Sequence, residues 1–153
     1  MGMSVNGNIC YGVLLDVDSD IPWEDEKYEF DIEVWWRKIK GFEQSREIYT
    51  DDGERRLDGI TEDDVKKHYA EEHEWLKDNP LPVELVNYCS GDEPMYILAY
   101  PDSVLTCYLG HPLKVSSAVI DTDNAESLLI DFCKDHLIRY VGAPELWLSS
   151  YYG

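Results

Sequence analysis

The sequence predicts an α+β fold: a mainly antiparallel sheet of about five strands with about three helices packed against it in a single pair of layers. Short apolar runs rich in Val, Ile, Leu and Tyr alternate with turn residues, which is typical of strands. Longer segments carry apolar residues at helical spacing between capping signals. With 153 residues, the chain is expected to form a single domain over 1–153, with a polar excursion at 42–60.

The first expected elements are one strand and one helix. The strand covers 8–17, where Gly12 indicates a bulge or a close approach of two backbones. Asp31 is the expected N-cap of a helix over 32–40. Gly41 is a natural C-terminal stop for that helix.

Two further helices are indicated by capping residues and helical spacing. Thr61 is the expected cap of the second helix, with Asp64 three residues later as a near match to a capping box. The third helix is expected over roughly 125–137, capped by Thr122 or Asp123.

The remaining strands are expected in the second half of the chain. Residues 83–108 contain three short apolar runs separated by Gly, Pro, Asp and Ser, which predicts a β-meander at the centre of the sheet. A turn at 142–144 then leads into a last strand over 145–151.

The charge balance restricts the kind of partner. Thirty-two acids face thirteen bases, a net charge of −19, and the excess is spread along the chain. Direct nucleic-acid binding needs clustered Lys and Arg, so it is not expected. A basic protein surface is the expected partner, and acidity that serves solubility alone is the alternative. The oligomeric state is left open.

Cysteine usage and hydropathy indicate a cytoplasmic protein. The four cysteines form no Cys-x-x-Cys pair and lie in apolar runs, so four buried free thiols in a reducing compartment are expected. No apolar run reaches membrane-spanning length, and no secretory leader is visible.

The motifs of common enzymes and metal sites are missing. The Asp-x-Asp-x-Asp run at 16–20 has Ile21 and Lys27 where an EF-hand needs Gly and Glu. His68 and His73 point to different sides of their helix. The chain is therefore expected not to be an enzyme and to use no catalytic residue, metal or cofactor. A small enzyme or ligand-sequestering protein, with a site assembled only by the fold, is an alternative.

The acidic residues have spacings close to those of backbone phosphates. Alternate strand residues lie about 7 Å apart, and residues three or four apart on a helix about 5–6 Å. A rigid array of this kind would occupy the basic groove of a nucleic-acid-binding protein. The expected partner-binding residues are Asp16, Asp18, Asp20, Glu24, Asp25, Glu26, Glu29, Glu33, Trp36, Glu71, Glu72 and Glu74.

Aromatic residues offer an alternative interaction surface. Trp35 and Trp36 are adjacent, and Trp147 precedes a Tyr-Tyr pair near the C-terminus. Adjacent tryptophans in a helix are usually one core residue and one rim residue. Exposed aromatics among acids form a plausible hot spot, and in that case the acidity is incidental.

Several segments resemble small acidic proteins of tailed bacteriophages that have no assigned function. These segments are Asn-Ile-Cys-Tyr-Gly-Val-Leu-Leu-Asp at 8–16, Asp-Ile-Glu-Val-Trp-Trp at 31–36, Leu-Pro-Val-Glu-Leu-Val at 81–86, Pro-Met-Tyr-Ile-Leu-Ala at 94–99 and Trp-Leu-Ser-Ser-Tyr-Tyr-Gly at 147–153. The resemblance implies a phage protein that acts in the host cytoplasm. By analogy with small acidic phage inhibitors, it implies an anti-CRISPR or other anti-defence role, with DNA mimicry as one mechanism.

Overall fold

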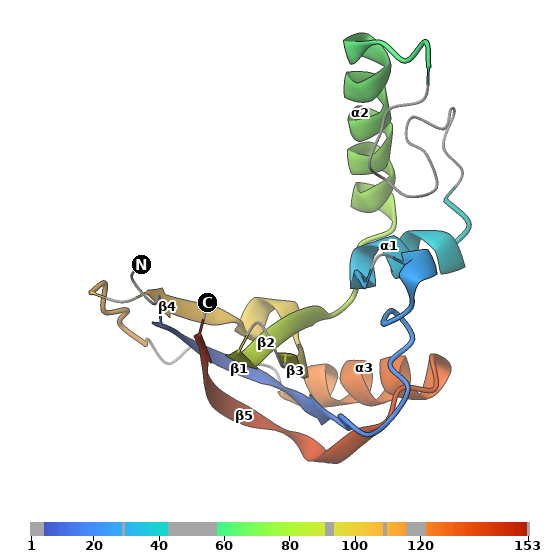
Figure 1. The fold of residues 1–153 in the computed structure, drawn as a ribbon. Coiled ribbons are helices and arrows are strands. Elements are labelled where there is room, and N and C mark those ends of the chain that lie inside the picture. Colours follow the sequence, from blue (N-terminus) through green and yellow to red (C-terminus); the bar gives the residue numbers. More distant parts are fainter. Residues whose placement is uncertain are drawn as a thin grey trace. The chain divides into compact units, whose positions relative to one another are not determined.

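The computed structural model describes residues 5–28, 30–42, 58–90, 94–108, 110–115 and 122–152. Three α-helices and a five-stranded, mostly antiparallel sheet make up this part of the chain (Figure 1), which confirms the predicted α+β class. The chain divides into two compact units, one formed by 1–32 with 82–153 and the other by 33–81. Each unit is described by itself below. Most of the expected excursion at 42–60 lies outside the described residues.

Strand β1 (Val5–Leu15) is the central strand of the first unit. Strand β5 (Tyr140–Tyr152) pairs with one edge of β1 along nearly its whole length. The other edge is shared, since β4 (Leu105–Tyr108) pairs with the first half of β1 and β3 (Pro94–Ala99) with the second half. The expectation that residues 83–108 form the centre of the sheet is therefore wrong.

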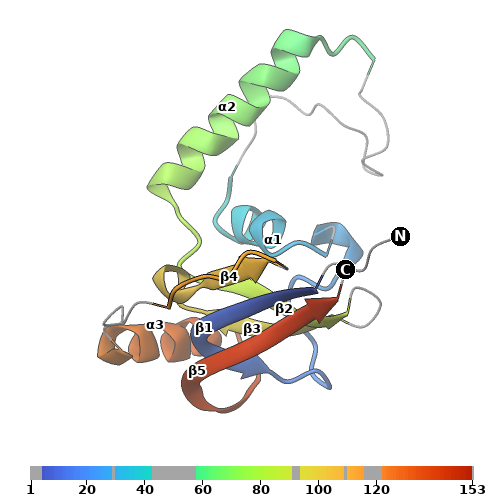
Figure 2. The same ribbon diagram turned by 90° about the vertical axis from the view of Figure 1, so that its left-hand side faces the viewer.

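Strand β2 (Glu84–Ser90) completes a closed circuit of strand pairing. It pairs antiparallel with β3, and its last two residues pair in parallel with Tyr151 and Tyr152 of β5. The pairing therefore runs from β1 through β3, β2 and β5 back to β1. Figure 2 shows β1 and β5 side by side, with β2 and β3 behind them.

The predicted meander stops after its second strand. Strands β2 and β3 form a hairpin, but β4 pairs with β1 instead of β3. A 3-10 turn over Pro101–Ser103 carries the chain onward along β1. This turn is fixed to Tyr11, whose N–H donates to Ser103 Oγ at 2.9 Å and whose carbonyl accepts from the Tyr100 N–H at 2.9 Å.

The sheet buries apolar side chains on both of its faces. The inner face of the closed circuit holds Cys10, Val86, Ile97 and Ala99, with Trp147 packed against them. On the other face, helix α3 (Thr122–Asp135) contacts β1 and β5. It buries Ala125, Leu129, Phe132 and Cys133. Burying apolar area on two faces is how a sheet this small gains enough stabilisation to fold.

Two expected boundaries near the C-terminus are wrong. Helix α3 begins at Thr122, so the expected caps lie within its first turn. Residues 142–144 are part of β5 and form an irregularity there, because Glu145 pairs with Gly12 while Val141 pairs with Leu14. The Gly and Pro residues that indicate a turn instead accommodate a bulge, with Gly142 at φ 76°.

The second unit contains α2 (Glu62–Asp78) and nearly all of α1 (Ile32–Ile39). Thr61 caps α2 in a full capping box with Asp64, which confirms that prediction. Trp36 Nε1 donates to the Asn79 carbonyl at 3.0 Å. None of the described helices is long and apolar enough to cross a membrane.

Candidate interaction surfaces and pockets

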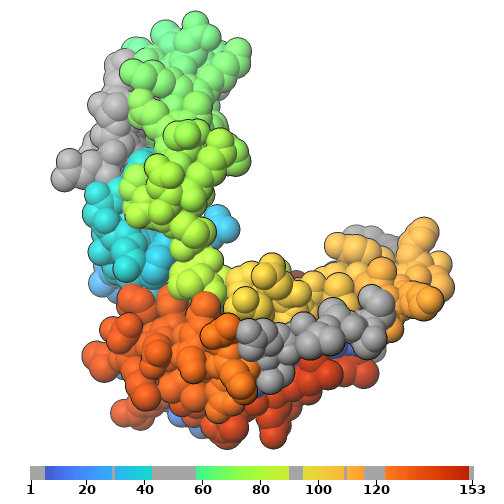
Figure 3. Space-filling view, turned by 180° about the vertical axis from the view of Figure 1, so that it is seen from behind, coloured from blue at the N-terminus to red at the C-terminus, as the bar shows by residue number. Residues whose placement is uncertain are grey.

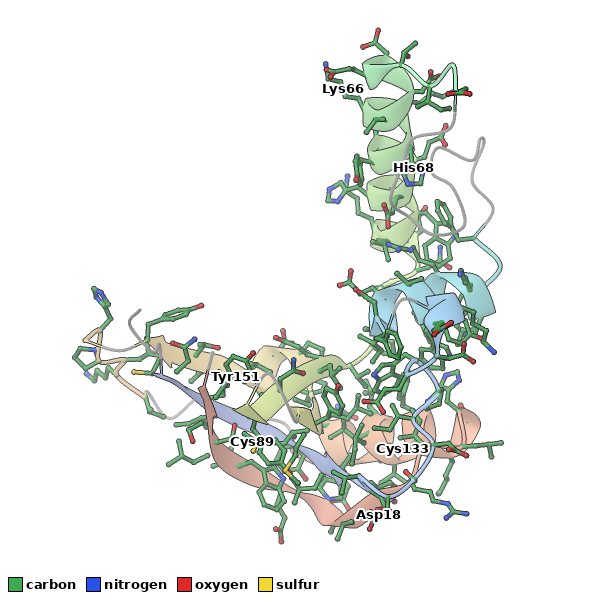
Figure 4. All side chains as sticks on the ribbon, viewed as in Figure 1. Asp18, Lys66, His68, Cys89, Cys133 and Tyr151 are labelled. Atoms are coloured by element: carbon green, nitrogen blue, oxygen red, sulfur yellow. The ribbon has the colours of Figure 1, made fainter. Side chains whose placement is uncertain are left out.

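The segment after β1 is a short acidic loop with an ordered turn. Asp16 Oδ1 accepts from the Asp18 N–H at 3.1 Å, and the Asp16 carbonyl accepts from the Ser19 N–H at 3.1 Å. These bonds satisfy backbone groups that the end of the strand leaves unpaired. Asp18 and Asp20 are exposed, and Figure 4 shows Asp18 beyond the end of β1.

Three further predicted acids follow in the same segment and are exposed: Glu24, Asp25 and Glu26. Glu24 accepts a hydrogen bond from Tyr96 of β3, and burial together with this carboxylate raises the pKa of Tyr96 to about 12. Asp25 pairs with Lys27 at 3.3 Å. A partner that binds this segment would therefore disturb fewer existing contacts at Asp18, Asp20 and Glu26 than at Glu24 or Asp25.

The predicted residues of the second unit are mostly engaged within it. Glu72 is largely buried against Arg37, with which it forms an ion pair. Glu71 lies 3.7 Å from Lys67 and Glu74 lies 3.1 Å from Lys77. Glu72 therefore has little surface to offer, whereas Glu74 remains exposed. Glu33 is also exposed, and Glu29 lies outside the described residues.

The tryptophans of the aromatic alternative are turned inward. Trp35 and Trp36 are both buried, so the expectation of one core and one rim residue is wrong. Trp147 lies against the inner-face core and donates from Nε1 to the Gly12 carbonyl at 2.9 Å. The buried rings of Trp35 and Trp36 have little area for a partner, whereas Trp147 is only partly buried.

A second acidic surface lies on α3 and was not among the predicted site residues. Asp123, Glu126 and Asp131 are exposed on this helix, which lies at the surface in Figure 3. Burial raises the pKa of Tyr11, and the charges of Glu126, Asp123 and Glu145 of β5 raise it further. Asp123, Glu126 and Glu145 therefore all act electrostatically on one phenol. The three-residue spacing of Asp123 and Glu126 on a predicted helix was the signal in the sequence that would have found these two, whereas Glu145 comes from a strand.

The negative charge is concentrated in the first unit. Of the 32 acids and 13 bases in the chain, this unit carries 18 acids and 4 bases, and the second unit 14 acids and 9 bases. The even spread along the chain conceals this imbalance, because the first unit is assembled from two distant segments.

A polar pocket of about 360 Å³ opens on the inner face of the sheet. Its polar lining comes from β1, β2 and β4, through Asn6, Asn8, Glu84, Asn87 and Thr106. The rings of Tyr108 and Tyr151 complete the wall, and Figure 4 shows Tyr151 near the end of β5. Burial of part of its surface raises the pKa of Glu84.

An apolar pocket of about 440 Å³ lies on the same face, toward β3. Leu14, Tyr88, Met95, Ile97 and Trp147 line it. Cys89 also lies at this pocket and is exposed, with φ 76°. Both pockets fall in the size range of small-ligand sites.

The described residues contain no group of three His, Cys, Asp or Glu side chains that could hold a metal ion. The four cysteines are free, as expected, but only Cys10 and Cys133 are buried. Burial raises the pKa of each of these two thiols to about 11, which disfavours the nucleophilic thiolate form at neutral pH. His68 is buried, whereas His73 on the same helix is exposed.

No protein-family model, no curated protein and no solved structure matches this chain.

Proposed function

We propose that this protein is an acidic inhibitor of phage type, which acts in the host cytoplasm by occupying the nucleic-acid-binding surface of a basic host protein. The observation that carries the proposal is the excess of 18 acids over 4 bases in the sheet-containing unit. A field of this size attracts basic surfaces and speeds their association. The resemblance to small acidic phage proteins implies a phage protein, and the anti-defence role, including inhibition of CRISPR complexes, follows by analogy with small acidic phage inhibitors.

Two exposed groups of carboxylates would provide the contacts. The first is the acidic loop, with Asp18, Asp20 and Glu26, and the second is α3, with Asp123 and Glu126. Both are attached to the paired strands, through β1 and through the packing of α3 on β1 and β5. A preorganised acidic surface loses less conformational entropy on binding than a disordered acidic tail would.

The test is a pull-down followed by a competition assay. Immobilised protein is exposed to bacterial lysate at 50, 150 and 500 mM NaCl, and retained proteins are identified by mass spectrometry. We expect basic nucleic-acid-binding proteins at low salt and their loss at high salt, because surface charge interactions are screened. Duplex DNA should displace the retained partner, and the protein should in turn inhibit DNA binding by that partner.

Matched charge variants locate the contact. Asp18→Asn, Asp20→Asn and Glu26→Gln together should weaken partner binding about tenfold. The control neutralises three exposed acids of α2 through Glu62→Gln, Asp63→Asn and Asp78→Asn, and it should change binding little. If no basic partner is retained at 50 mM NaCl, or if both triple variants weaken binding equally, the proposal is wrong.

A further inference from the structure

The polar pocket is built by the register of three strands. Asn6 of β1 pairs with Tyr108 of β4 on one side and Tyr151 of β5 on the other. Directly paired residues point to the same face, so two phenol rings flank the Asn6 amide. One register step inward, Thr106 Oγ1 donates to Asn8 Oδ1 at 2.9 Å.

The chemistry of the lining selects for positive charge. Among the described residues, Glu84 is the only carboxylate in the lining, and none of the four bases of the first unit, all of which are described, contributes to it. The faces of Tyr108 and Tyr151 carry the negative part of the ring quadrupole, which attracts cations. Amide carbonyls add acceptors for the N–H groups of an ammonium or guanidinium.

Anionic and purely apolar ligands fit the pocket poorly. An anion would meet the net negative field of the unit, and none of the unit's four bases, all in the described part of the chain, lines the pocket to bind it. An apolar molecule would desolvate Asn8, Glu84 and Thr106 without replacing their hydrogen bonds, and the neighbouring apolar pocket serves such a molecule better.

We propose that this pocket binds an organic cation, an alkylammonium or alkylguanidinium group, with Glu84 as its counter-ion and Tyr108 and Tyr151 against its hydrocarbon and charged surfaces. The cation is either a free small molecule or a Lys or Arg side chain of another protein. The site does not depend on the proposed inhibitor function.

The test uses butylguanidinium as the probe and its neutral isostere butylurea as the comparison. Both are titrated into the full-length protein in 150 mM NaCl and followed by two-dimensional ¹H–¹⁵N NMR. We expect saturable shifts of the β2 and β4 amides with butylguanidinium, with a Kd on the order of 1 mM, and none with butylurea. Shifts of equal size with butylurea would overturn the proposal, since the charge would then be irrelevant.

Variants separate the pocket from general counter-ion attraction. Glu84→Gln should weaken binding about tenfold, because it removes a charge-assisted contact. Tyr108→Leu should weaken it roughly threefold through loss of one ring face. Asp135→Asn removes one exposed charge from the same unit, outside the pocket, and should leave binding unchanged. Equal weakening by Asp135→Asn and Glu84→Gln, or shifts that do not saturate, would overturn the site.

A peptide distinguishes the two sources of the cation. Acetyl-Gly-Arg-Gly-amide carries the same guanidinium on a backbone. Binding of the peptide with the affinity of butylguanidinium supports a protein side chain as the natural ligand. Binding of butylguanidinium alone supports a free small molecule, because the pocket then excludes the attached backbone.

Discussion

Gly12 allows β1 and β3 to approach each other. A Cβ atom at this position would lie 2.5 Å from the Leu98 carbonyl oxygen and 2.8 Å from Ile97 Cγ2. The Gly12 carbonyl accepts a hydrogen bond from Trp147 Nε1 of β5 at 2.9 Å. Gly12 therefore joins three strands of the closed circuit at one point, and only a residue without a side chain fits there.

Substitution of Gly12 should destabilise the sheet. We expect Gly12→Ala to lower the free energy of unfolding by about 1–3 kcal/mol, because the added methyl group meets backbone atoms that cannot move freely. Urea titration followed by tryptophan fluorescence measures this change. Gly7→Ala is the matched control in the same strand, since its nearest neighbouring atom lies 4.0 Å away. Equal stability of the two variants would contradict the argument.

At the residue level, the sequence predicted the role of Gly12 but not the burial of Trp36 and Glu72. A glycine within an apolar run has few explanations, so its pattern is informative. Glu72 was assigned to the surface because of its charge, but its ion pair with Arg37, a residue 35 positions away, draws it inward. Such a pairing depends on how α1 packs against α2, which no local pattern reveals.

At the level of elements, the termini that depend on local chemistry were predictable. The α2 capping box and the stop of α1 at Gly41, with φ 74°, follow from neighbouring residues alone. The partner of β4 and the bulge at 142–144 were not predictable. Both depend on pairing with β1 across about a hundred residues or more of chain, and turn residues serve bulges as well as reversals.

His68 makes the stability of α2 dependent on pH. Its side chain is about 90% buried, with Nε2 3.9 Å from Glu72 Oε2. Burial lowers the pKa of His68, and Arg37 lowers it further, while Glu71 opposes the shift. Because the pKa is lower in the folded state than the ordinary value of 6.5, the unfolded state binds the proton first. Stability from this group is complete above pH 6.5 and is lost as the pH falls below it.

A comparison of wild type with His68→Gln isolates this contribution. Urea unfolding followed by far-UV circular dichroism at pH 8, 6.5 and 5 gives the free energy of unfolding of each protein. We expect the wild type to lose more stability than the variant between pH 6.5 and pH 5. Parallel pH profiles would show that His68 is not buried in its neutral form.

At the level of the whole molecule, the two units differ in how they handle charge. The second unit balances part of its acidity with ion pairs such as Arg37–Glu72 and Lys77–Glu74. The first unit has 18 acids and only 4 bases, so its acids far outnumber the bases that the same unit supplies. The sequence gives the total charge directly, but the division between units depends on the assembly of 1–32 with 82–153.

This excess charge should make the folded state sensitive to ionic strength. Like charges held on one compact unit repel each other more than they do in the expanded unfolded chain, and salt screens this repulsion. We expect the free energy of unfolding to rise by on the order of 1 kcal/mol between 20 and 500 mM NaCl. Urea titrations at each salt concentration measure the change, and KCl should act as NaCl does if screening is the cause. A fall in stability with salt would mean that ion pairs such as Arg37–Glu72 outweigh the repulsion. A partner that covers the acidic surfaces with positive charge would remove the same repulsion, so stabilisation by salt and stabilisation by a basic partner should not be additive.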